Sequence, residues 1–249
     1  MSKNLAIDIK NLNKVYSNGF KALDKLTLEV PEGSFFGLLG PNGAGKSTLI
    51  HCLTGLSIPT GGEAKIFDYD AVKDYKNARS MLGMSPQEIN LDWFLSVEDT
   101  LDYHGGYHRM KKPERKKRAD ELLKAFKLED KRKDNIRNLS GGMKRRLVIA
   151  RALMHKPKVL ILDEPTAGVD IELRHDLWKY MKKENKSGTT ILLTTHYIEE
   201  AEELCDQIAL INKGKIIYSG TKEAIKKHYK KNDLESIYLE AIHGKDRSK

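Results

Sequence analysis

The sequence predicts an α/β fold in which a mostly parallel β-sheet is flanked by helices, and three segments support this prediction. Residues 159–162 and 190–194 have the apolar character of strands buried on both faces, as in a parallel sheet. Residues 35–39 form another apolar run, which leads into a glycine-rich loop and then into a helix-like segment. Strands and helices therefore alternate around one core sheet.

The N-terminal third predicts an antiparallel β subdomain beside this sheet. Residues 5–14 alternate between apolar and polar side chains, which is the period of a half-buried strand. Residues 23–30 alternate in the same way, and Pro31 and Gly33 then form a turn into the strand that precedes the glycine-rich loop.

Residues 91–138 instead have helical character, which predicts an α-helical subdomain inserted into the main domain. Ser96 and Asp99 fit a helix-capping box, and Pro113 opens a further helix. Seven basic residues and one acidic residue lie between Arg109 and Arg118. A solvated helix face is the favoured interpretation of this cluster, and contact with nucleic acid or anionic lipid is the alternative.

Composition limits the classes of protein to consider. The chain has 249 residues, a mean hydropathy of −0.55 and a net charge of +9. No window approaches the run of about 18 apolar residues that spans a bilayer. The positive charge indicates an anionic neighbour, which can be a nucleotide, nucleic acid or a membrane surface. Cys52 and Cys205 lie in apolar helical contexts, so we expect buried thiols and a reducing, cytosolic compartment.

The glycine-rich loop fits the pattern G-x-x-x-x-G-K-[ST] between a strand and a helix, which predicts a phosphate-binding loop. Its residues are Gly40, Pro41, Asn42, Gly43, Ala44, Gly45, Lys46 and Ser47. Glycines let the backbone curl closely around a polyphosphate, and the N–H groups and the helix N-terminus attract its negative charge. Lys46 would contact the β- and γ-phosphates, and the Ser47 hydroxyl would bind Mg²⁺. The chain is therefore predicted to bind a nucleotide.

A second anion-binding helix N-terminus is predicted far along the chain from the first. Ser140 is followed by Gly141 and Gly142, and an apolar periodic helix begins there. A single ATP needs only one such loop unless two copies of the chain share it.

Chemistry-bearing side chains follow two of the predicted strands. The strand at 159–162 ends in Asp163 and Glu164, which we expect to point in different directions, so that one serves Mg²⁺ and the other a water molecule. His196 follows the strand at 190–194. The carboxyl ends of strands are where α/β sheets bind ligands, so His196 is a candidate contact for the γ-phosphate.

Two further residues are candidates from their positions. Gln87 lies at a strand-to-loop junction, where a lone glutamine is usually a surface residue. Tyr16 lies in a polar stretch ahead of the phosphate loop, so it is either a ring that stacks on a purine or an ordinary tyrosine at a strand end.

Taken together, these motifs resemble the nucleotide-binding subunit of an ATP-binding cassette (ABC) transporter, in the order of that family and over the chain to about residue 220. The matched segments are Walker A at 40–47, the Q-loop residue Gln87, the signature motif at Leu139, Ser140, Gly141 and Gly142, Walker B at 159–163 with Glu164, the D-loop at 167–170, and the switch residue His196. Met143 departs from the family pattern, which usually has Gln there. The segments around Met143 and Gly168 resemble the export-type (ABC-2) subfamily, whose membrane subunit is a separate chain.

The resemblance implies a mechanism in which two subunits meet head to tail, as a homodimer or a heterodimer. Each ATP would lie between Lys46 and Thr48 of one copy and Ser140, Gly142 and Met143 of the other. Tyr16 would stack on adenine. Glu164 would be the general base, and His196 would steady the γ-phosphate. Mg²⁺ would be held by Ser47, Gln87 and Asp163, and Asp170 would be the D-loop residue.

The resemblance also implies a role, partners and domain boundaries. Residues 1–220 would form the ABC ATPase domain, with the helical insertion at about 91–140, and residues 221–249 would form a basic helical tail. We expect an ATPase at the cytoplasmic face of the cell membrane that powers export through an integral membrane permease, without direct contact to nucleic acid. The alternative is a soluble ABC ATPase that acts on nucleic acid, ribosomes or an assembly complex.

Overall fold

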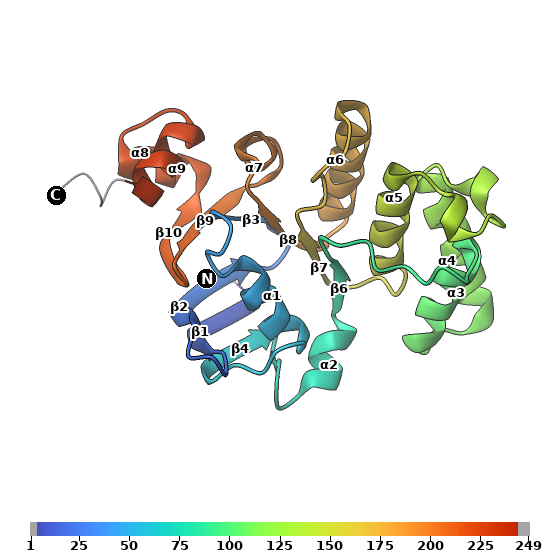
Figure 1. The fold of residues 1–249 in the computed structure, drawn as a ribbon, viewed down its shortest axis with the longest axis horizontal. Coiled ribbons are helices and arrows are strands. Elements are labelled where there is room, and N and C mark those ends of the chain that lie inside the picture. The colour runs from blue at the N-terminus through green and yellow to red at the C-terminus, as the bar shows by residue number, and fades with distance from the viewer. Residues whose placement is uncertain (1–3, 244–249) are drawn as a thin grey trace.

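The computed structural model describes residues 4–243, and its centre is a six-stranded sheet in the order β10-β9-β3-β8-β7-β6 (Figure 1). Its strands are β3 (Phe35–Leu39), β6 (Leu82–Ser85), β7 (Val159–Asp163), β8 (Thr190–Thr195), β9 (Gln207–Asn212) and β10 (Lys215–Thr221). Neighbouring strands from β9 to β6 run parallel, and β10 joins β9 as an antiparallel hairpin. The predicted mostly parallel sheet is therefore confirmed.

The register of this sheet aligns the carboxyl ends of its central strands. Leu39 pairs with Thr195, and Asp163 pairs with Thr194. Because β3, β7 and β8 end at the same edge, the loops that follow them begin side by side. This alignment brings the glycine-rich loop, Glu164 and His196 to one edge of the sheet.

A second, antiparallel sheet in the order β2-β1-β4-β5 forms the N-terminal part of the fold, as the alternating sequence predicts. Its strands are β1 (Leu5–Val15), β2 (Lys21–Pro31), β4 (Gly61–Ile66) and β5 (Tyr69–Asp70). It is joined to the large sheet at the β9–β10 hairpin, where Asp24 N–H donates to the Gly214 carbonyl at 3.0 Å and Lys215 pairs with the Asp24 carboxylate at 3.0 Å.

Nine α-helices are assigned within residues 4–243. They are α1 (Lys46–Thr54), α2 (Tyr75–Ser80), α3 (Val97–Tyr107), α4 (Lys112–Ala125), α5 (Gly141–Ala152), α6 (Ile171–Lys186), α7 (Ile198–Leu204), α8 (Lys222–Tyr229) and α9 (Leu234–His243). Helices α3, α4 and α5 gather at the end of the molecule opposite the β1–β2 sheet (Figure 1). The predicted cap of α3 is confirmed, because the Ser96 hydroxyl accepts from Asp99 N–H at 3.1 Å.

Each face of the large sheet packs against its own hydrophobic core. Leu160 and Leu162 of β7 pack with the helices from α3 to α7, whereas Val159 and Ile161 pack with α1 and the N-terminal sheet. Because successive side chains of a strand point to opposite faces, a strand between two cores must be apolar throughout. Both cysteines are buried and free, as the sequence predicts.

The C-terminal segment continues past β10 into α8 and α9, and residues 244–249 of the predicted basic tail lie outside the described part of the chain. Among the described helices, none combines the length and the apolar character that a bilayer crossing requires.

Candidate active site

The glycine-rich loop connects β3 to α1 in a conformation that its glycines permit. Gly45 directly precedes α1 with φ 110°, in the left-handed region that favours glycine. A Cβ at this position would lie 2.9 Å from the Ala22 carbonyl oxygen, so a larger residue would also collide with β2. The turn between β9 and β10 also holds the loop, because Gly214 N–H donates to the Ala44 carbonyl at 2.9 Å.

Lys46 is buried at the first position of α1 and folds back over the loop. Its ammonium donates to the carbonyls of Gly40 at 2.7 Å and Pro41 at 3.2 Å, and lies 3.9 Å from Glu164 Oε1. Burial lowers the pKa of Lys46, while the carboxylates of Glu164 and Asp163 oppose that shift. The positive charge is therefore held at the mouth of the phosphate loop by contacts that an incoming polyphosphate can replace.

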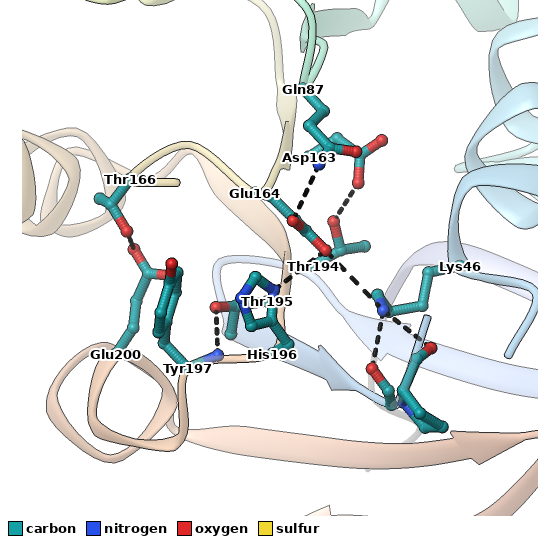
Figure 2. Close-up of polar contacts among 12 residues, drawn as sticks. Lys46, Gln87, Asp163, Glu164, Thr166, Thr194, Thr195, His196, Tyr197 and Glu200 are labelled. Carbon is teal, nitrogen blue, oxygen red and sulfur yellow. Dashed lines mark hydrogen bonds and ion pairs between the residues drawn. The ribbon is translucent and has the colours of Figure 1, made fainter. Parts of the chain in front are cut away.

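Glu164 is the centre of the polar network at this edge of the sheet (Figure 2). Gln87 Nε2 donates to Glu164 Oε2 at 3.0 Å, and His196 Nδ1 lies 3.2 Å from Glu164 Oε1. With Lys46, three segments that are far apart in the sequence thus contact one buried carboxylate. The structure brings together these four predicted residues.

Asp163 and Glu164 do point in different directions, but strand alternation is not the whole reason. Asp163 ends β7, and its carboxylate accepts from the Thr194 hydroxyl of β8. Glu164 lies beyond the strand at φ 46°, a backbone conformation that costs a non-glycine residue about 1–3 kcal/mol. Its N–H donates to the Thr194 carbonyl at 3.0 Å, so β8 holds the strained residue in place.

A cleft opens beside the phosphate loop. It is lined by Phe20, Ala22, Asn42, Gly43, Gly45, Lys46, Ser47, Thr48, Gln87 and Glu164. Tyr16 lies nearby, with its hydroxyl 3.3 Å from Thr48 Oγ1 and its side chain partly exposed. The sequence did not predict Phe20 as a residue of this cleft. In the structure Phe20 is a strongly exposed aromatic at the turn after Tyr16. Exposure of a large aromatic beside a glycine-rich loop is visible only in the folded chain.

The second predicted anion site is not brought to this cleft. Ser140 caps α5, accepting from Met143 N–H at 3.2 Å, and Asp170 caps α6, accepting from Leu173 N–H at 2.8 Å. Ser140, Gly142 and Asp170 line a separate cleft between these two helices. Helices α1 and α5 lie well apart in Figure 1. Within one chain, the two predicted phosphate-binding segments therefore line different clefts.

Two buried charged residues that support the site were missed in the sequence. Arg145 of α5 donates to the carbonyls of Pro86 at 2.8 Å and Gln87 at 2.5 Å. Glu200 of α7 accepts from the hydroxyl of Thr166 at 2.9 Å (Figure 2). It also accepts from the Trp178 indole N–H at 3.1 Å. Both lie in ordinary amphipathic helix patterns, so their sequence contexts carry no signal of these contacts.

Comparison with known proteins identifies the family of this chain. A protein-family model described as ABC transporter matches residues 23–167, which is more than half of the chain. The chain belongs to the ABC transporter family. Its assignment as an ABC ATPase agrees with the sequence motifs, and the ATPase core with its N-terminal antiparallel sheet agrees with the predicted fold class.

Curated relatives of this ABC ATPase are export and resistance proteins. It is 42% identical over 217 residues to the linearmycin resistance ATP-binding protein LnrL of Bacillus subtilis, covering 87% of this chain and 69% of the relative. It is 41% identical to the Nod factor export ATP-binding protein I of Cupriavidus metallidurans, covering 86% and 70%. It is 38% identical to the daunorubicin resistance ATP-binding protein DrrA3 of Streptomyces coeruleorubidus, covering 95% and 74%. These relatives confirm the export-type resemblance.

Solved structures share the whole fold. A structure of the ATP binding subunit of an ABC transporter has a TM-score of 0.88 and 29% identity, and covers 95% of this chain and 99% of its own. The ATP-binding cassette MJ0796, in a dimeric post-hydrolysis state bound to ADP and Pi, has a TM-score of 0.79 and 30% identity, covering 86% and 98%. MJ0796 is thus a cassette of the same fold that forms a dimer and holds the products of ATP hydrolysis.

Proposed function

We propose that this ABC ATPase powers an exporter from the cytoplasmic face of the cell membrane, acting on a separate permease that binds the cargo. The observation that carries the proposal is the convergence of Lys46, Gln87 and His196 on the buried carboxylate of Glu164. That carboxylate lies beside a phosphate loop, where a general base must be to deprotonate a water aimed at a γ-phosphate. The names of the curated relatives support export as the direction.

In this mechanism the protein residues act in turn. Lys46 exchanges the Gly40 and Pro41 carbonyls for the β- and γ-phosphates. His196 contacts the γ-phosphate, and Glu164 accepts a proton from the attacking water. The new P–O bond forms to that water, the bond from phosphorus to the ADP oxygen breaks, and ADP and phosphate are released. Tyr16 stacks on the adenine ring.

The donor set at the site fits Mg²⁺. Ser47, Gln87 and Asp163 offer a hydroxyl, an amide oxygen and a carboxylate, and hard cations such as Mg²⁺ take oxygen ligands. The Gln87 amide nitrogen is engaged by Glu164, which leaves its amide oxygen for the ion. When bound, the ion neutralises charge on the β- and γ-phosphates.

The second half of each ATP site is proposed to come from another copy of the chain or from a similar subunit. Ser140, Gly141 and Gly142 present the N-terminus of α5 to their own cleft, apart from the phosphate loop. Head-to-tail pairing would place Leu139 to Met143 of one copy against the ATP on the other, with Asp170 at the contact. We further propose that residues 1–220 form the ATPase domain, with a helical subdomain at about 91–140 and a helical tail after residue 220.

The direct test is to tag this chain in its own cell, solubilise membranes in mild detergent and identify what co-purifies. A multi-span membrane protein in stoichiometric amount is the expected result. Recovery only from the soluble fraction, with nucleic acid or ribosomes attached, would overturn the exporter proposal in favour of a soluble ABC ATPase.

A further inference from the structure

Three histidines meet at a place that the ATPase site does not use. His104 lies on α3, His108 ends the same helix one turn later, and His155 lies in the turn after α5. Their rings contact one another, with centroids 4.8 Å apart for His104 and His108 and 3.6 Å apart for His108 and His155. One nitrogen of each ring lies within 4.8 Å of the others, and all three side chains are partly buried.

The backbone around the cluster is built for close approach. Helix α3 packs on α5, and Gly105 lies beside Met154 of the turn that carries His155. A Cβ at Gly105 would lie 3.1 Å from Met154 Cε and 3.0 Å from Arg115 Cδ, tighter than ordinary contacts. Glycine at this position leaves room for the ends of these two side chains beside the histidines.

The hydrogen bonding of His155 leaves one nitrogen ready to coordinate. Its Nε2 lies 2.8 Å from the Leu82 carbonyl, and because a carbonyl only accepts, Nε2 carries the proton. Nδ1 then holds a free lone pair, and it is buried without a hydrogen-bond partner among the described residues. Metal-binding histidines usually have this arrangement, with the second ring nitrogen donating to a backbone carbonyl.

We propose that His104, His108 and His155 form a binding site for one divalent transition metal ion, with zinc as the representative, which links α3 to the turn after α5. Imidazole nitrogen is a preferred ligand for zinc, and three histidines with one open position make a familiar tetrahedral set. His155 Nδ1 is among the few buried side-chain polar atoms that lack a partner within the described residues, and a bound ion would give it one.

Binding requires a small rearrangement. Bonds of about 2.0–2.1 Å to zinc place tetrahedral nitrogens about 3.3 Å apart. The rings of His108 and His155 now lie parallel, with an interplanar angle of 8°, so both lone pairs cannot aim at one ion between them. His108 is the residue that turns, because it lies just beyond the last residue of α3, while His155 Nε2 is held by the Leu82 carbonyl.

The electrostatics of the cluster favour the neutral ligand form. Burial, assisted by the neighbouring histidines, lowers the pKa of His104 to about 3. Burial also lowers the pKa of His155 to about 4 and lowers the pKa of His108. Coordination needs unprotonated nitrogen, so no proton has to be displaced at neutral pH.

The test is zinc and cobalt titration of untagged protein without nucleotide, because a histidine tag would bind the same ions. We expect one zinc ion to bind per chain and to raise the midpoint temperature of thermal unfolding. Bound cobalt should give a visible absorption spectrum typical of an ion with few ligands. His108→Gln should weaken zinc binding by at least about 10- to 100-fold, the range found when even a residue behind a metal ligand is changed. His104→Ala should do the same.

The matched control is His175→Ala, which removes an exposed histidine of α6 outside the cluster and should bind zinc as the wild type does. Circular dichroism and ATP binding check that each variant is folded. His108→Gln keeps the test usable if His104→Ala fails to fold, because His108 is at a helix end. Zinc binding by wild type no tighter than by His108→Gln, or an equal loss in His175→Ala, would overturn the proposal.

Discussion

The guanidinium of Arg145 is bonded to the backbone of Gln87, with 2.5 Å between Nη2 and the Gln87 carbonyl oxygen. A second bond joins Nη1 to the Pro86 carbonyl at 2.8 Å. Arg145 belongs to α5, the helix that Ser140 caps, and the side chain of Gln87 contacts Glu164. One buried side chain therefore connects the signature helix to the loop that touches the proposed base.

Replacing Arg145 should loosen this connection. Hydrogen bonds to charged groups contribute about 1.5–3 kcal/mol each, and Arg145→Ala also leaves two carbonyls without their donor, so we expect a loss of about 3 kcal/mol or more in unfolding free energy. Arg145→Lys should lose less than Arg145→Ala, because its ammonium keeps the charge and can donate to one of the two carbonyls. It should still be less stable than wild type, because it cannot reproduce both bonds of the fork. Urea unfolding measures this loss, with Lys117→Ala on the exposed face of α4 as the control. Equal stability of Arg145→Ala and the control would show that the fork contributes nothing.

Glu164→Gln tests the base. The amide keeps the shape of the side chain but cannot take a proton from water, so turnover should fall by about 10²–10⁴, the usual contribution of general base catalysis. ATP should still bind, because Lys46 and the phosphate loop are unchanged. Steady-state phosphate release and nucleotide affinity separate the two effects, with Glu235→Gln on α9 as a distant control. Turnover at the wild-type rate would remove Glu164 from the role.

Tyr16 and Phe20 are the two candidates for stacking on the adenine ring, because both lie at the cleft beside the glycine-rich loop. Stacking contributes about 0.5–1.5 kcal/mol, so Tyr16→Ala should weaken ATP binding by a factor of about 2 to 10 and leave the rate of chemistry largely intact. Tyr16→Phe keeps the ring and loses only the hydroxyl contact with Thr48, so it should bind nearly as tightly as wild type. If Phe20→Ala instead weakens binding while Tyr16→Ala does not, the exposed Phe20 in the cleft is the stacking residue.

Glu200 gives a prediction for the pH dependence of stability. Burial raises the pKa of Glu200 above its ordinary value of 4.5, although hydrogen bonds from Thr195, Thr166 and Trp178 oppose the shift. Above pH 4.5 the unfolded chain loses this proton while the folded chain keeps it, so unfolding becomes easier until the folded pKa is passed. Below pH 4.5 both states are protonated and the effect vanishes.

Glu200→Gln replaces the titrating carboxyl group with an amide, which keeps an oxygen acceptor for Thr166 and Trp178. The variant should therefore gain stability relative to wild type as the pH rises from 4.5, and the gain should level off beyond the folded pKa. Denaturant unfolding at several pH values measures how the difference in unfolding free energy between variant and wild type changes with pH. This change does not depend on any pH-independent loss of stability caused by the amide. A difference that stays flat with pH would show that Glu200 has the same pKa in both states.

Much of this fold was predictable because its signals are local. Strands β7 and β8 are buried throughout and carry the apolar runs 159–162 and 191–193. Because strand ends in a parallel sheet converge, the sequence alone placed Glu164 and His196 together. The phosphate loop is equally local, since its glycines and Lys46 are consecutive in the chain. The sequence also predicted a second phosphate-binding segment that a single ATP would not need. In the structure the two segments line separate clefts.

The features that the sequence did not predict depend on contacts between residues far apart in the chain. Arg145 lies 58 residues from Gln87, in a basic run that looks like a solvated helix face. Glu164 has a left-handed backbone held by Thr194 of the next strand, which strand alternation does not predict. The histidine cluster joins residues of α3 to a turn about 50 residues away, and only the packing of the two helices reveals it.

The central claim, that each ATP site is shared between two copies, is tested most directly by mixing two defective chains. Lys46→Ala removes the proposed phosphate contact, and Ser140→Glu places a negative charge where the γ-phosphate of the other copy's ATP would lie. Each alone should be inactive under conditions in which the wild-type chain hydrolyses ATP. In a mixed pair, one site has an intact Lys46 from one copy and an intact Ser140 from the other, so the account predicts recovery of ATPase activity well above the sum of the parts. A mixture that stays as inactive as its components would contradict the shared site.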